Sequence, residues 1–129
     1  MKWAVLVARV LVGLPFFMLG LNHFLNFMPM PAPELPDAAM KFGTALGESG
    51  YMNAVKVLEV VGGALLLSGR LVPLGLVLLT PVAVNILLFE LFLAKQPGPG
   101  AVFVALCAFL VWTYRSSFAP LFTVNAKIG

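Results

Sequence analysis

Four long apolar segments, separated by polar joints, account for most of this chain. They cover residues 3–24, 52–68, 71–89 and 99–113. A helix needs roughly 20 apolar residues to cross the ~30 Å hydrocarbon core of a bilayer. An open sheet would leave backbone hydrogen bonds unmade in lipid, and four short segments cannot close a barrel. The pattern therefore predicts an all-α membrane protein, in which four antiparallel transmembrane helices form a bundle and one domain, residues 1–129.

The first joint is much longer than the other two, since it runs from residue 25 to residue 51. It opens with a proline-rich run, Met28–Pro36, and apolar residues then recur at helical spacing at Ala38, Phe42, Ala45 and Leu46. We expect Pro36–Leu46 to form a short amphipathic helix on the outer membrane surface. A loop of this length in a small protein is typical of function. The alternative, that it only closes the open end of the bundle, is equally good.

Composition and charge narrow the class of protein. Hydrophobic residues make up 61% of the chain and the mean hydropathy is +1.03, which excludes a water-soluble domain of this size. The sequence pI is about 9.4, but the eight basic residues form no cluster, so nucleic-acid binding is not expected.

The distribution of lysine and arginine predicts the orientation. Five basic residues fall on the side of the two termini: Lys2, Arg9, Arg70, Arg115 and Lys127. Three fall on the other side, where Glu34, Asp37 and Glu48 dilute them: Lys41, Lys56 and Lys95. Because basic residues are retained in the cytoplasm, both termini of this multi-pass protein should be cytoplasmic.

Polar side chains inside the apolar segments are the candidates for function, because each is costly in lipid. Those that we expect to bind a ligand are Arg9, Asn22, His23, Lys56, Glu59, Asn85 and Glu90. A rise of ~1.5 Å per residue places Glu59 and Asn85 at a similar depth. We predict that polar groups from three helices converge on one interior seam. It would form an outward-opening pocket under the Pro36–Leu46 helix, with apolar walls from Phe16, Phe24 and Phe27.

Each of these residues also has a structural interpretation. Glu59 with Arg9 or Lys56 would be an ion pair that fixes helix register, and this alternative is as good as ligand binding. His23 alone near a helix end is typical of an interfacial residue, and Asn85 of a hydrogen bond between helices. The chain has one histidine and one cysteine, Cys107, so we expect no bis-histidyl haem and no metal site.

Several motifs together resemble one family. They are Arg9-x3-Gly13-x6-Gly20-x2-His23-Phe24, Glu59-x2-Gly62-Gly63, Gly69-Arg70 and Val72-Pro73-Leu74. This combination, over nearly the whole chain, resembles the DoxX-like family of small four-helix bacterial membrane proteins. In the subgroup that the sequence resembles most, a histidine is expected where this chain has Glu90.

The resemblance implies a bacterial inner (cytoplasmic) membrane protein and, as the first hypothesis, a quinone-linked redox membrane subunit whose polar pocket holds the quinone head group. The alternatives are a non-catalytic carrier or sensor of a small lipophilic ligand, or an accessory or assembly subunit of a larger membrane complex. The sequence has no flavin, haem or iron–sulfur motif, so the isolated chain is not expected to be an enzyme. Membrane or redox partner subunits would supply such cofactors.

Overall fold

The computed structural model describes residues 1–31 and 34–129, and all regular structure in these ranges is helical, as predicted. The elements are α1 (Lys2–Leu25), α2 (Asp37–Ser49), α3 (Tyr51–Ser68), α4 (Val72–Leu88), the π-helix η1 (Phe89–Ala94), α5 (Gly100–Thr113), α6 (Arg115–Phe118) and the 3₁₀-helix η2 (Ala119–Phe122). Residues 32–33 of the proline-rich run Met28–Pro36 lie outside the described residues.

Three helices are long and apolar enough to cross a membrane: α1, α3, and α4 continued by η1 to Ala94. The 14 residues of α5 extend only ~21 Å, which is less than the hydrocarbon thickness. Together with Arg115–Phe122, from which it is separated by a bend of 82°, α5 would make a fourth span. The chain is therefore a helical protein with three candidate transmembrane helices, or four if the bent pair is one span.

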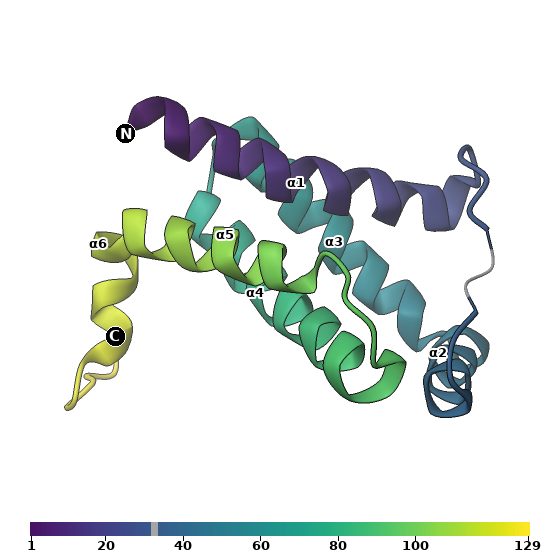
Figure 1. The fold of residues 1–129 in the computed structure, drawn as a ribbon. Helices are drawn as coiled ribbons and strands as arrows, with labels where there is room; N and C mark the ends of the chain where they lie inside the picture. Colours follow the sequence, from purple (N-terminus) through teal and green to yellow (C-terminus); the bar gives the residue numbers. More distant parts are fainter. Residues whose placement is uncertain (32–33) are drawn as a thin grey trace.

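The long helices run antiparallel to their neighbours in sequence (Figure 1). Helix α1 packs against α3 and α5, and α4 packs against the same two helices. The N-terminus, the α3–α4 joint and the C-terminal segment lie at one end of the molecule, called here the terminal end. Helix α2 and the joint between η1 and α5 lie at the opposite end, called here the α2 end (Figure 1).

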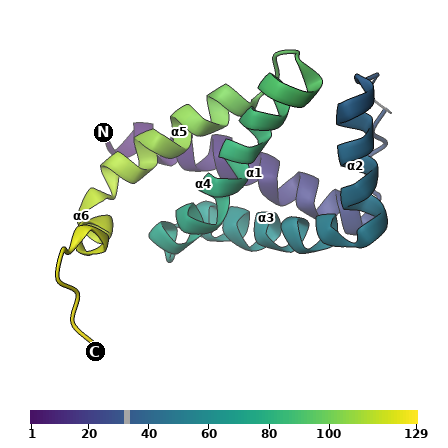
Figure 2. The same cartoon turned by 90° about the horizontal axis from the view of Figure 1, so that it is seen from below.

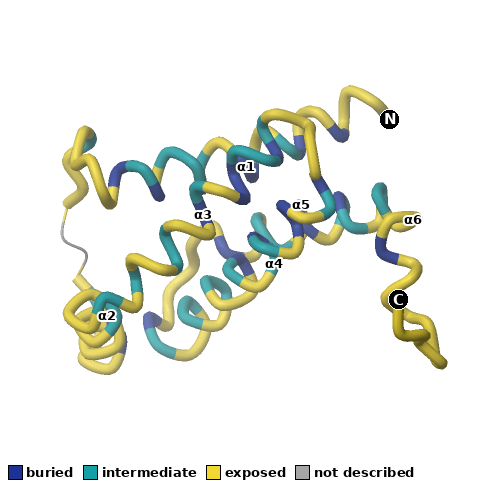
Figure 3. Tube along the Cα trace, turned by 180° about the vertical axis from the view of Figure 1, so that it is seen from behind, coloured by how far each residue is buried: buried dark blue, intermediate teal, exposed yellow. Residues whose placement is uncertain are grey.

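The hydrophobic core lies mainly toward the terminal end. Its buried side chains are Val5, Ala8, Val12, Phe16, Leu66, Val72, Leu76, Leu79, Ala83, Cys107, Leu110 and Phe118. Large apolar side chains such as Trp3, Leu11 and Val77 are exposed, as expected of lipid-facing helices. Exposed positions recur along each of the long helices (Figure 3). Toward the α2 end, α3 and η1 diverge, and α2 lies across the end of the bundle in contact with both (Figure 2).

Glycines allow α3 to approach both of its neighbours. A Cβ atom on Gly63 would lie 2.7 Å from the carbonyl oxygen of Gly13 and 2.8 Å from the backbone nitrogen of Phe17. On the opposite interface, a Cβ on Gly62 would lie 2.6 Å from Cγ of Leu79. Small residues at helix crossings are the usual means of close packing in lipid, and here they bring backbones into direct contact.

A helix is present in the first joint, but its buried face differs by one residue from the prediction. Ala39 is fully buried and Leu46 is half-buried, whereas Ala38 is exposed. The ring of Phe42 lies 5.7 Å from the ring of Phe89 in η1. Ala39, Phe42 and Leu46 are spaced i, i+3, i+7, so they lie on one face of α2. Helix α2 packs with α3 and with η1, and these two contacts cover that face, including Ala39.

Candidate functional site

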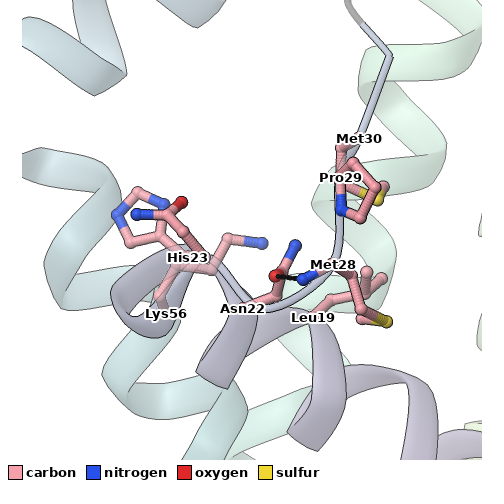
Figure 4. Close-up of a pocket in the computed structure, with 8 residues that line it drawn as sticks. Leu19, Asn22, His23, Met28, Pro29, Met30 and Lys56 are labelled. Atoms are coloured by element: carbon pink, nitrogen blue, oxygen red, sulfur yellow. Dashed lines mark hydrogen bonds between the residues drawn. The ribbon is translucent and has the colours of Figure 1, made fainter.

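A pocket of about 520 Å³ lies at the α2 end, where α1 ends. Its lining comes from the last turns of α1, the segment that follows, and α3: Leu19, Asn22, His23, Asn26, Met28, Pro29, Met30 and Lys56. Figure 4 shows the polar side chains of Asn22, His23 and Lys56 on one side and the two methionines on the other. The pocket therefore combines hydrogen-bonding groups with an apolar wall.

Asn22 holds the turn that forms this wall. The helix ends at Asn26, whose left-handed conformation (φ 52°) lets its N–H donate to the backbone carbonyl of Asn22 over 2.8 Å. The side-chain oxygen of Asn22 then accepts a hydrogen bond from the N–H of Met28 over 2.7 Å. The Asn22 side-chain amide nitrogen points into the space beside Lys56 (Figure 4). One nearly buried side chain thus fixes the loop and offers a donor to the pocket.

His23 connects α1 to α3. Its Nε2 atom lies 2.7 Å from Oδ1 of Asn53, and its ring meets Phe24 edge-on at 5.1 Å between centroids. An amide oxygen is an acceptor, so in this arrangement the Nε2–H group of His23 donates to Asn53. Asn53 was not among the residues predicted from the sequence. It lies one turn before Lys56, so helical spacing already places both residues on the same face of α3.

Glu59 pairs with Lys56, one of the two partners predicted for it. The Lys56 Nζ atom lies 3.1 Å from Oε1 of Glu59, and the carboxyl side chain is 5% exposed. Because the two residues are spaced i, i+3, the pair lies along one face of α3. Lys56 lines the pocket, with Glu59 one turn further along α3 as its counter-charge. An ammonium group has three donors, so pairing leaves Lys56 able to donate to a ligand.

Arg9 does not pair with Glu59, and it does not line the pocket. Its Nε atom donates to the backbone carbonyl of Leu66 over 2.9 Å, in the last turn of α3. The last carbonyls of a helix have no partner within it, and a nearby cation satisfies them well. Arg9 also precedes His23 by 14 residues on the same helix, which corresponds to about 21 Å.

Asn85 and Glu90 are likewise directed elsewhere. The exposed Asn85 side chain donates to the backbone carbonyl of Pro81, one turn earlier, over 2.9 Å. The Glu90 carboxylate accepts the N–H of Gly100 at 3.0 and 3.2 Å, at the beginning of α5. Negative charge is favourable at a helix N-terminus, so Glu90 caps α5.

The single seam predicted from sequence is therefore divided between separate places. Of the seven candidates, Asn22, His23 and Lys56 line the pocket, and Glu59 contacts it through Lys56. Neither α2 nor any of the three predicted phenylalanines belongs to its lining. The reason is that Arg9 and Glu90 bond to free backbone groups at a helix end, and Asn85 bonds to a carbonyl of its own helix, instead of meeting across the bundle.

Within residues 1–31 and 34–129, no group of three or more His, Cys, Asp or Glu side chains is placed to hold a metal ion. Comparisons with protein-family models, with curated proteins and with solved structures find no match to the chain. The fold and the site thus define a helical protein with candidate transmembrane helices and a polar pocket at one end.

Proposed function

We propose that this chain is a four-span protein of a bacterial cytoplasmic membrane, of the DoxX-like type, whose pocket at the α2 end binds the head group of a quinone. The fourth span would consist of α5, and because its ~21 Å is less than the hydrocarbon thickness, the bilayer would be thinned locally around it. The bend of 82° would then direct Arg115–Phe122 along the membrane surface, where the Arg115 guanidinium stacks 4.6 Å above the Trp112 ring. Aromatic and basic residues are typical of that interface. The excess of basic residues at the terminal end favours a cytoplasmic location for both termini.

The observation that carries the proposal is the chemistry of the pocket lining. A quinone presents two carbonyl oxygens on an apolar ring, so it needs hydrogen-bond donors beside hydrocarbon. The Lys56 ammonium and the Asn22 amide nitrogen supply donors, and Leu19, Met28 and Met30 supply the apolar contact. The volume of about 520 Å³ is within the range of small-molecule sites.

In this proposal the chain binds and positions the quinone and carries out no reaction alone. Electrons would come from a partner subunit that carries its own flavin, haem or iron–sulfur centre. The same pocket would serve a carrier or sensor of a small lipophilic ligand, which needs no redox partner.

One observation favours a different function, that of an accessory or assembly subunit. The polar groups around the pocket already bond within the protein, through the contacts Asn22–Met28, His23–Asn53 and Lys56–Glu59. Polar side chains whose hydrogen-bonding groups are paired within the protein stabilise the helix bundle without any ligand.

Photolabelling separates these functions. The protein in nanodiscs is irradiated with a photoreactive naphthoquinone or benzoquinone analogue, and the labelled peptides are identified by mass spectrometry. We expect labelling of residues 19–30, reduced about tenfold in Lys56→Gln, which loses one charged hydrogen-bond donor. Asn85→Ala is the matched control, because Asn85 lies outside the pocket, and it should be labelled like the parent. Equal labelling of all three proteins would contradict quinone binding in this pocket.

A further inference from the structure

Arg9 contacts the α3–α4 joint at the terminal end, far from the pocket. Its guanidinium lies against Gly69 in the α3–α4 joint, where a Cβ atom would be 2.9 Å from Nη2 and 3.3 Å from Nη1. Gly69 has φ +75°, so a side chain is disfavoured there for backbone reasons as well. The Nε–H group of Arg9 donates to the Leu66 carbonyl, and its two terminal nitrogens, Nη1 and Nη2, lie at the joint.

A second guanidinium belongs to the same joint. Arg70 follows Gly69 directly and is exposed, and its backbone N–H donates to the Ser68 hydroxyl over 3.2 Å. The following residues present apolar surface, since Leu71, directly before α4, and Leu74, in its first turn, are exposed. The Arg9 guanidinium therefore meets the joint from α1, while Arg70 lies in the joint and is followed in sequence by exposed apolar side chains.

In the part of the chain that the structure describes, neither arginine forms an ion pair with an acidic side chain. The acidic residues of the chain are Glu34, Asp37, Glu48, Glu59 and Glu90. Glu59 is the nearest along α3, ten residues or about 15 Å before Gly69, and Lys56 already neutralises it. Within the described ranges, no salt bridge involves Arg9 or Arg70. A partly buried guanidinium at a membrane boundary without an anionic partner is costly, so an external anion is favoured.

We infer that the Arg9–Arg70 joint binds the phosphate of an anionic phospholipid. The fork of a guanidinium matches two phosphate oxygens, and a second arginine adds charge and further donors. The exposed Leu71 and Leu74 would contact the acyl chains below the head group. This inference rests on the membrane insertion proposed above, but it does not depend on the quinone pocket, which lies at the opposite end.

Native mass spectrometry tests the site directly. The protein is released from nanodiscs of phosphatidylcholine with increasing phosphatidylglycerol, and the bound anionic lipid is counted. We expect Arg70→Gln to weaken retention of phosphatidylglycerol about tenfold, since one charged donor group is lost. Arg9→Lys, which keeps the charge but loses the fork, should also weaken it. Arg115→Gln is the matched control at the same end, and it should retain lipid like the parent.

Three results would overturn this assignment. Unchanged retention in Arg70→Gln would exclude the joint. Equal weakening in Arg70→Gln and Arg115→Gln would show diffuse attraction to a basic surface instead of a site. Displacement of the lipid by millimolar inorganic phosphate would assign the joint to a soluble anion. Quinone labelling of the same variants reports on the pocket separately, so failure of one site is distinguishable from failure of the other.

Discussion

Glu59 lies on α3 with its carboxylate buried, and the Lys56 ammonium 3.1 Å away is its counter-charge. Removing one member of such a pair leaves the other charge without compensation. We therefore expect Glu59→Gln to lower the free energy of unfolding in detergent by about 2–4 kcal/mol. Lys56→Met combined with Glu59→Leu should recover most of this loss, because apolar side chains then replace both charges.

Arg9 provides the control for that pair. Since Arg9 bonds to Leu66 and not to Glu59, Arg9→Leu combined with Glu59→Leu should not recover stability. Recovery in that double variant, or a Glu59→Gln protein as stable as the parent, would show that the Lys56–Glu59 contact is assigned wrongly. Chemical unfolding followed by circular dichroism measures all of these variants on one scale.

At the scale of elements, the contact between α1 and α3 depends on Gly63. An added methyl group would meet the backbone of Gly13 and Phe17, which cannot move aside as a flexible side chain does. We expect Gly63→Ala to lower the free energy of unfolding by about 1–3 kcal/mol through overpacking. Thermal unfolding in a fixed detergent measures the effect.

Gly43 in α2 is the matched control, because an added Cβ there meets nothing within 4 Å. Gly43→Ala should be neutral or stabilising by up to about 1 kcal/mol, since alanine favours the helix. A Gly63→Ala protein that behaves like Gly43→Ala would contradict the close approach of the two helices.

The sequence predicted the positions of the main helices well, because breakers and caps mark their ends. The Gly69-Arg70 joint and the cluster Lys95–Gly100 separate α3, α4 and α5 close to where the structure does. It did not predict the continuation of α4 into η1 or the helices after Thr113. Residues 89–94 are apolar apart from Glu90, and apolarity alone does not distinguish α-helical from π-helical turns.

The candidate site was predicted only in part for a related reason. Spacing along one helix identifies its polar stripe but not the rotation of that helix against its neighbours or the direction of a long side chain. Lys56 and Glu59 lie on one helix, so their contact was one of the two pairings that the sequence predicted for Glu59. Arg9, Asn85 and Glu90 instead bond to backbone atoms at Leu66, Pro81 and Gly100, which the sequence pattern does not reveal.

At the scale of the whole molecule, the proposed topology places the terminal end in the cytoplasm and α2 outside. Single cysteines at Ser49 and at Lys127, each in a Cys107→Ala background, test this with an impermeant thiol reagent on intact cells. Ser49→Cys, at the end of α2, should be labelled, and Lys127→Cys only after the membrane is permeabilised. Labelling of Lys127→Cys on intact cells would reverse the orientation.

Quinone retention through purification tests the central claim most directly. The protein is isolated from its membrane in mild detergent, and extracted quinones and co-purifying polypeptides are identified by mass spectrometry. Quinone binding in the pocket predicts that the parent and Asn85→Ala retain quinone in comparable amounts, while Lys56→Gln and His23→Ala lose most of it. A parent protein that carries no quinone but co-purifies with other membrane polypeptides would contradict this account and favour an accessory subunit.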